Sequence, residues 1–144
     1  MANDSWVGFA KSPKPDPNLS RLRVEASLEI AVPAERAFQL VTSAAGLSSW
    51  LQKTEKSTVQ TSGKIFFSDV EENLSRAVFS LVEVGRRVVI NSELFGEIEI
   101  TLDSKKSKLQ ISFTKMISAT ERETQQATFE SCLAKLRESL AVEK

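Results

Sequence analysis

The chain has 144 residues, with 19 basic and 19 acidic side chains, no histidine, no tyrosine and one cysteine. The balanced charge predicts no nucleic-acid partner, and no apolar run is long enough for membrane insertion. The missing histidine excludes Ser-His-Asp and Cys-His catalysis. A single cysteine also excludes an intramolecular disulfide and a cysteine-based zinc site, so we expect a cytoplasmic protein without a metal or cofactor.

The first twenty residues are predicted to form a flexible tail. Three prolines alternate with charged residues between positions 13 and 17, which favours an extended and unpaired segment. Trp6, Val7 and Phe9 are unusual in such a tail. They either cluster locally or dock on the domain surface, or they plug a groove or contact a second subunit. Residues 21–144 are predicted to form one domain.

A strand over residues 22–32 is the clearest first element, because apolar and polar side chains alternate along it. Pro33 ends this strand and suits the first turn of a short helix that follows. Residues 44–51 are typical of a second short helix, in which Gly46 permits a tight turn at its start and Trp50 lies near its end. Beyond it the pattern indicates strands only.

Six strands are expected between the second helix and residue 113. The first of them is weak and polar, which is typical of an edge strand. Phe66 and Phe67 must face opposite sides of their strand, whereas Phe79 and Leu81 are expected to share one face. The short spacings favour hairpins, so the strands predict an antiparallel meander. The expected ranges are 57–61, 64–70, 76–82, 86–91, 97–102 and 108–113.

The last segment, residues 120–142, predicts one long amphipathic helix. Two capping-box pairs, Ser118 with Glu121 and Thr120 with Glu123, indicate where it starts. A helix of this length spans roughly 30 Å and must bury its apolar side on an extended partner. The apolar stripe consists of Phe129, Cys132, Leu133, Leu136 and Leu140.

The order of these elements defines an α+β fold. We expect a curved antiparallel sheet of about seven strands that grips the long C-terminal helix, with the two short helices placed after the first strand. The apolar side of the sheet and the apolar stripe of the helix are natural partners.

Three stretches resemble the helix-grip superfamily of START-like and birch-pollen-allergen-like domains, also called SRPBCC. They are ASLEIAVPAERAF at 26–38, LSSWL at 47–51 and FSLVEVGRRVVI at 79–90. Within that superfamily the chain is most similar to the subfamily of the activator of the heat-shock-chaperone ATPase. The sequence departs from it at Cys132, where an aromatic residue is common, and in the low glycine content between Gln52 and Gly63.

The resemblance implies a cavity between the sheet and the long helix. Members of the superfamily bind lipids, sterols or other hydrophobic molecules, some act as cyclases or hydrolases, and some assist chaperones. The residues expected to line the cavity are large inward-facing side chains and the helix stripe; the alternative is that they fill a solid core. They are Trp50, Phe67, Phe79, Leu81, Phe113, Phe129, Cys132 and Leu133.

The functional hypothesis is a non-enzymatic binding domain that holds a small hydrophobic molecule between sheet and helix, with a mouth near Trp50. The small side chain of Cys132 leaves space on the helix, and its thiol is expected to be buried and inert. One alternative is a co-chaperone-like domain that binds a protein partner, although the Asn-x-Asn-x-Trp-His-Trp signature of the chaperone activator is absent. The other alternative is a cyclase- or hydrolase-like enzyme. The oligomeric state is not predicted.

Overall fold

The computed structural model describes residues 19–68 and 74–141 as a seven-stranded antiparallel sheet with three helices. The predicted order of one strand, two short helices, six strands and one long helix is confirmed, and so is the α+β helix-grip fold. The elements are β1 (Leu19–Glu29), α1 (Ala34–Thr42), α2 (Ala44–Trp50), β2 (Thr54–Ser57), β3 (Lys64–Ser68), β4 (Leu74–Glu83), β5 (Arg87–Ser92), β6 (Gly96–Asp103), β7 (Lys108–Ser118) and α3 (Arg122–Ala141).

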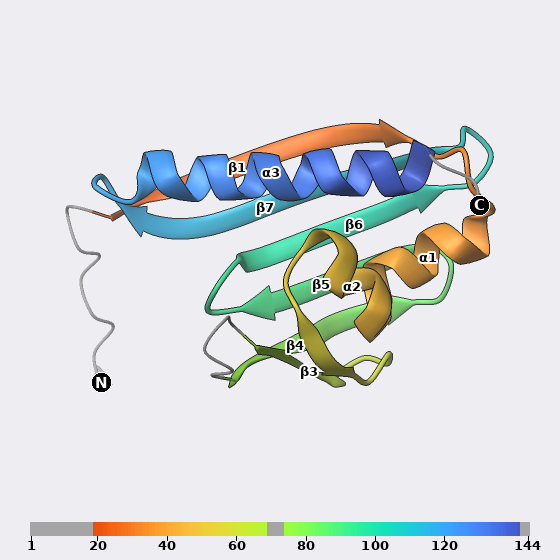
Figure 1. Ribbon diagram of the computed structural model, residues 1–144, viewed down its shortest axis with the longest axis horizontal. Helices are drawn as coiled ribbons and strands as arrows, with labels where there is room; N and C mark the ends of the chain where they lie inside the picture. Colours follow the sequence, from red (N-terminus) through yellow and green to blue (C-terminus); the bar gives the residue numbers. More distant parts are fainter. Residues whose placement is uncertain (1–18, 69–73, 142–144) are drawn as a thin grey trace, which may run out of the picture.

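The strands lie in the order β1-β7-β6-β5-β4-β3-β2, so the first strand pairs with the last, and β1 and β2 form the two edges. All three helices lie on one side of the curved sheet. The long helix α3 runs along β1 and β7, and α1 and α2 lie over the other half (Figure 1). We call the helix-covered side of the sheet its inner face and the opposite side its outer face.

The alternation in β1 explains how the sheet acquires two different faces. Leu22 and Leu28 are each 2 % exposed and face inward, whereas Arg23 and Glu25 are exposed on the outer face. The same period of two continues in β6, where Ile98 and its apolar neighbours alternate with acidic residues. One face of the sheet is therefore apolar enough to hold a helix.

The core lies between the inner face and the helices. Phe113 of β7 stacks on Phe129 of α3, with ring centroids 4.5 Å apart and planes 14° apart. Phe67 of β3 meets Phe95 edge to face at 5.8 Å. The largest fully buried side chains come from nearly every element: Trp50, Phe67, Phe79, Phe113, Phe129, Leu28, Leu47, Ile65, Ile90, Ile98, Ile100 and Leu109.

Helices α1 and α2 form a tight corner. Gly46 lies so close to the end of α1 that a Cβ atom there would approach the Gln39 carbonyl oxygen to 2.4 Å and the Leu40 Cα to 2.6 Å. The Ser43 hydroxyl caps α2 by accepting a hydrogen bond from the Gly46 N–H at 3.0 Å. At the other end of α2, the Trp50 indole Nε1–H donates to the Leu40 carbonyl at 2.6 Å. These contacts fix the position of the chain that leaves α2.

The structure corrects the expected orientation of Leu81. Phe79 is paired with Ile90 and Leu81 with Val89, so β4 contains one residue more than β5 between these pairs. This β-bulge at Ser80 reverses the alternation, and Leu81 therefore lies opposite Val89 on the outer face, where it is only partly buried. Phe79 keeps its inward position and is fully buried.

Several predicted boundaries shift while the elements remain. The edge strand β2 covers Thr54–Ser57, earlier than the predicted range 57–61. Its position follows from its pairing with β3, in which Thr54 lies opposite Phe67 and Ser57 opposite Ile65. β1 begins at Leu19, inside the predicted tail, whereas the rest of that tail lies outside the described residues. Phe67 is buried and Phe66 half-buried, as their opposite orientations require.

Helix α3 begins at Arg122, two residues later than the predicted start at Thr120. The Ser118 hydroxyl contacts the Glu121 carboxylate at 3.0 Å, and the Glu121 carbonyl accepts the N–H of Gln125 at 2.9 Å, so the first turn starts after Glu121. The predicted last residue, Val142, lies outside the described residues. In the described part of the chain, none of the helices combines the length and apolar character that crossing a membrane requires.

Candidate functional site

A groove lies between α3 and the segment that connects α2 to β2. Its volume is about 840 Å³, within the range of about 300–1,000 Å³ that is usual for small-molecule sites. One wall is formed by Leu51 and Gln52, and the other by one side of α3. The lining residues are Leu51, Gln52, Thr120, Glu123, Thr124, Ala127, Thr128, Ser131, Cys132 and Lys135.

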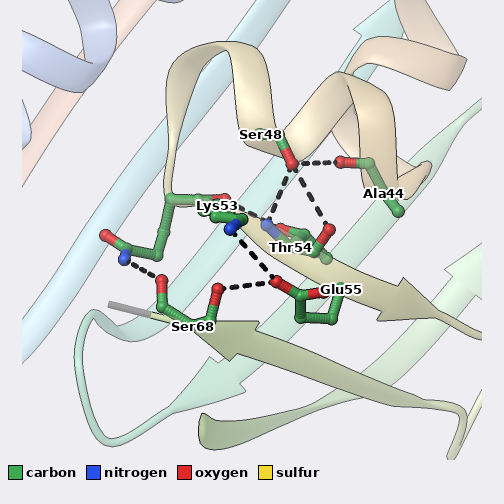
Figure 2. A network of polar contacts seen from close by, with 7 residues as sticks. Ala44, Ser48, Lys53, Thr54, Glu55 and Ser68 are labelled. Atoms are coloured by element: carbon green, nitrogen blue, oxygen red, sulfur yellow. Dashed lines mark hydrogen bonds and ion pairs between the residues drawn. The ribbon is translucent and has the colours of Figure 1, made fainter. Parts of the chain in front are cut away.

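The first wall is held in place by a hydrogen-bond network at the end of α2 (Figure 2). The Ser48 hydroxyl donates to the Ala44 carbonyl at 2.7 Å and accepts the Thr54 N–H at 2.9 Å. Ser48 therefore joins the last turn of α2 to the first residue of β2. The three residues between them, Leu51 to Lys53, form a short bridge that is anchored at both ends.

Ser68 at the end of β3 anchors the middle of this bridge. Its N–H donates to the Lys53 carbonyl at 2.9 Å, and its carbonyl accepts the Gln52 side-chain amide at 2.6 Å. Its hydroxyl donates to a Glu55 carboxylate oxygen at 2.9 Å, as Figure 2 shows. Ser68 is 2 % exposed, so these bonds are shielded from water, and the first wall of the groove is preorganised.

The second wall is a stripe of short side chains along α3. Short side chains recur along α3 every three to four residues, so they share one side of the helix. They are Thr124, Ala127, Thr128, Ser131 and Cys132. This side is adjacent to the buried stripe that faces the sheet. Because these side chains are short, they leave room beside the helix where longer ones would fill it.

The groove has a charged side chain near each end and a middle in which hydroxyl groups outnumber apolar side chains. Glu123 lies in the first turn of α3, whereas Lys135 lies three turns further along. Between them the exposed lining residues of α3 are Thr124, Ala127, Thr128 and Ser131, and Leu51 and Cys132 are buried at the base. This arrangement offers hydrogen-bonding groups along the groove and a charged group near each end.

Cys132 lies where the two walls meet. Its Sγ is 3.9 Å from the Leu51 carbonyl oxygen, and the residue is 4 % exposed. Burial raises the pKa of the Cys132 thiol above its ordinary value, and the positive charge of Lys135 opposes this shift only in part. The thiol is therefore neutral near pH 7 and acts as a small, weakly polar surface rather than as a nucleophile.

The predicted site residues fall into three groups. Cys132 lines the groove. Leu81 lies on the outer face of the sheet, away from the groove. The remaining six are buried between the sheet and the helices, with Trp50 directly before the first wall: Trp50, Phe67, Phe79, Phe113, Phe129 and Leu133. Their close aromatic contacts favour a filled core at that depth, and ligand contact by these six remains a prediction.

Sequence reasoning missed most of the groove lining. Thr124, Ala127, Thr128 and Ser131 are exposed, so a search for apolar periodicity does not select them. A different signal is present, because short side chains recur at helical spacing next to the apolar stripe. Gln52 could not be found in this way, since its orientation depends on Ser68, sixteen residues away.

Comparison with solved structures supports the fold. A protein of Nitrosomonas europaea shares 17 % identity with a TM-score of 0.63, covering 85 % of this chain and 96 % of that one. A Bacillus halodurans protein shares 12 % identity with a TM-score of 0.66, covering 84 % and 96 %. The Aha1 dimer from Colwellia psychrerythraea shares 13 % identity with a TM-score of 0.63, covering 87 % and 98 %.

Comparison with curated protein sequences finds no match. The family model described as "Activator of Hsp90 ATPase homolog 1-like protein" matches residues 31–141, which include every element from α1 to α3. The chain therefore belongs to the family of activator of Hsp90 ATPase homolog 1-like proteins.

Proposed function

We propose that this protein is a non-enzymatic binding domain that holds a small amphipathic molecule in the groove between α3 and the α2–β2 connection. The observation that carries the proposal is the groove itself, with a volume of about 840 Å³ and one wall formed by short side chains. The first wall, formed by Leu51 and Gln52, is held by buried hydrogen bonds of Ser68, so this wall is ordered before a ligand arrives.

The lining also defines the kind of ligand. Ala127 offers apolar surface among the hydroxyl groups of Thr124, Thr128 and Ser131, whereas Glu123 and Lys135 offer opposite charges near the two ends. A ligand with one polar end would satisfy one of these charges without burying an unpaired group. This favours an amphipathic molecule over a pure hydrocarbon.

The test is binding of the fluorophore 1-anilinonaphthalene-8-sulfonate to the native protein. We expect saturable binding with a stoichiometry of one. Ser131→Trp places a large side chain in the groove and should weaken binding at least tenfold, which corresponds to about 1.4 kcal/mol. Glu130→Trp is the matched control, because Glu130 is the adjacent exposed residue of α3 and does not line the groove.

Circular dichroism should show that both variants remain folded. Non-saturable fluorescence, or an equal effect of the two substitutions, would contradict binding in the groove. Native mass spectrometry of the protein as purified provides a second measurement, because a retained ligand would add a defined mass to the 15.9 kDa chain.

A second candidate function is a co-chaperone-like interaction with a protein partner. It is favoured by membership of a family named for activation of the Hsp90 ATPase, and a structural neighbour is described as a dimer. The corresponding test is the ATPase rate of Hsp90 with and without an excess of this protein. An increase in that rate that Ser131→Trp leaves unchanged would place the function outside the groove.

A further inference from the structure

We propose that the ligand of the groove is a compact organic acid, whose anionic group binds to Lys135 and Ser131 at one end of the groove. This inference rests on the proposed function, because it names the ligand class of the same site. It goes beyond a general amphipathic ligand by assigning the sign of the ligand's charge, the end of the groove at which that charge binds and the residues that recognise it.

The first observation is that the positive charge of Lys135 has no partner of its own. Lys135 lines the groove and is exposed. Within residues 19–68 and 74–141, none of the ion pairs includes its ammonium group, although Glu138 lies only one turn further along α3. Lys135 also lies before the last turn of α3, so it does not serve to balance the negative end of the helix dipole. Its N–H donors are therefore available to a ligand.

The opposite charge, at Glu123, is in a different situation. Glu123 lies in the first turn of α3, where a negative charge interacts favourably with the positive end of the helix dipole. Its carboxylate therefore stabilises the helix without a ligand, and it repels an anion from that end of the groove. The two ends are not equivalent, and the Lys135 end is the one that attracts an anion.

The third observation concerns the hydroxyl groups beside Lys135. The Thr128 hydroxyl donates to the Thr124 carbonyl at 3.0 Å, so its hydrogen is already used within the helix. The Ser131 hydroxyl forms no such bond in the described part of the chain. Because Ser131 precedes Lys135 by four residues, the two side chains lie on the same side of α3. They can donate to the two oxygens of one carboxylate, and hydrogen bonds to a charged acceptor are stronger than neutral ones.

The charge of Lys135 also acts at the base of the groove. Burial raises the pKa of the Cys132 thiol, and the positive charge of Lys135 opposes that shift. An anion bound at Lys135 would place the body of the ligand over Thr128 and Ala127, the latter about 12 Å away at 1.5 Å per residue. Hydroxyl groups outnumber apolar side chains there, which favours a compact acid over a long hydrocarbon chain.

The test compares two fluorophores that differ in charge. 1-Anilinonaphthalene-8-sulfonate carries an anionic group, whereas N-phenyl-1-naphthylamine has the same rings without it. Lys135→Gln should raise the Kd of the sulfonate about fivefold, the upper range for a charge pair that solvent screens, and should change the Kd of the neutral amine by less than about twofold. Lys135→Arg keeps the positive charge and should retain most of the affinity for the sulfonate.

Two control variants separate this contact from general electrostatics. Glu123→Gln changes the other charge of the groove, which lies about 18 Å from Lys135 along α3, beyond the Debye length of about 8 Å at physiological ionic strength. Arg137→Gln removes an exposed positive charge of α3 that does not line the groove. Both should change the Kd of the sulfonate far less than Lys135→Gln does. An equal or larger effect of either control would overturn the proposal.

Competition experiments test the class of the ligand directly. Naphthalene-2-carboxylate should displace the sulfonate fluorophore, and the neutral naphthalene-2-carboxamide should require a higher concentration to do so. Equal displacement by the acid and the amide would overturn the preference for an anion. Decanoate is the long-chain comparison, and displacement by decanoate at a lower concentration than the naphthalene acid would overturn the assignment to a compact acid.

The two proposals can fail separately. Saturable binding of both fluorophores that Ser131→Trp weakens and Lys135→Gln leaves unchanged would overturn the anion preference but leave the ligand site in the groove intact. Absence of saturable binding of either fluorophore would remove the ligand-binding function, and the anion preference with it.

Discussion

Phe129→Ala should be the most destabilising single change in α3, because Phe129 joins the helix to the sheet. The side chain is 0 % exposed and stacks on Phe113 at a centroid distance of 4.5 Å. Truncation of a buried phenylalanine costs about 3–5 kcal/mol, of which an aromatic pair contributes about 0.5–1.5 kcal/mol beyond its buried area. This is a large part of the total stability of about 5–15 kcal/mol expected for a domain.

The assay is urea unfolding followed by far-ultraviolet circular dichroism. With a slope of about 2 kcal/mol per M, a loss of about 4 kcal/mol lowers the midpoint by about 2 M. Glu130→Ala is the control on the adjacent exposed residue and should change the free energy of unfolding by less than about 0.5 kcal/mol. A double-mutant cycle of Phe113→Leu and Phe129→Leu should give a coupling of about 0.5–1.5 kcal/mol.

A loss below about 1 kcal/mol for Phe129→Ala, at an unchanged slope, would refute this reasoning. It would mean that the stripe of α3 contributes little to the core, and that the sheet holds its shape without the helix.

Three further predictions concern the corner of α1 and α2 and the thiol. Trp50→Phe removes the indole donor and leaves the Leu40 carbonyl unpaired in the core, so it should cost about 1–3 kcal/mol in urea unfolding; an unchanged midpoint would show that this bond is dispensable. Gly46→Ala forces a Cβ against the Gln39 carbonyl and should lower the thermal midpoint by several degrees, with a cost of about 1–3 kcal/mol; a rise in the midpoint would mean that the corner opens freely. Because burial raises the pKa of Cys132, its alkylation in the folded protein should begin at a higher pH than in a cysteine peptide. The stabilising effect of that thiol is complete below its unfolded pKa of about 8.5 and is lost as pH rises through the higher folded pKa. Alkylation rates are measured between pH 7 and about 10, and a pH dependence identical to that of the peptide would contradict the raised pKa.

The fold could be predicted from the sequence because its signals are local. Alternation in β1 and the stripe from Phe129 to Leu140 depend on residues close together in the chain, and both are confirmed. The orientation of Leu81 could not be predicted in this way. A β-bulge is defined by the pairing of two strands, and neither strand alone shows that Ser80 is the extra residue.

The candidate site was less predictable than the fold, for a related reason. Large apolar side chains reveal what is buried, whereas a groove is formed where side chains are short. Cys132 was found because it is a small member of the apolar stripe, but Ser131 and Thr128 look like ordinary surface residues of a helix. The role of Gln52 depends on a buried carbonyl of another strand, to which no local pattern points.

The pairing of β1 with β7 has a consequence for synthesis on the ribosome. β1 ends at Glu29 and its partner strand begins at Lys108, about 80 residues later. At 5–20 residues per second, β1 is made roughly 4–16 s before it can pair, and α3 follows later still. During that interval its apolar side is open to other nascent chains. The alternating charges of Arg23, Glu25 and Glu29 oppose association along the waiting strand, so they protect the chain before the fold can.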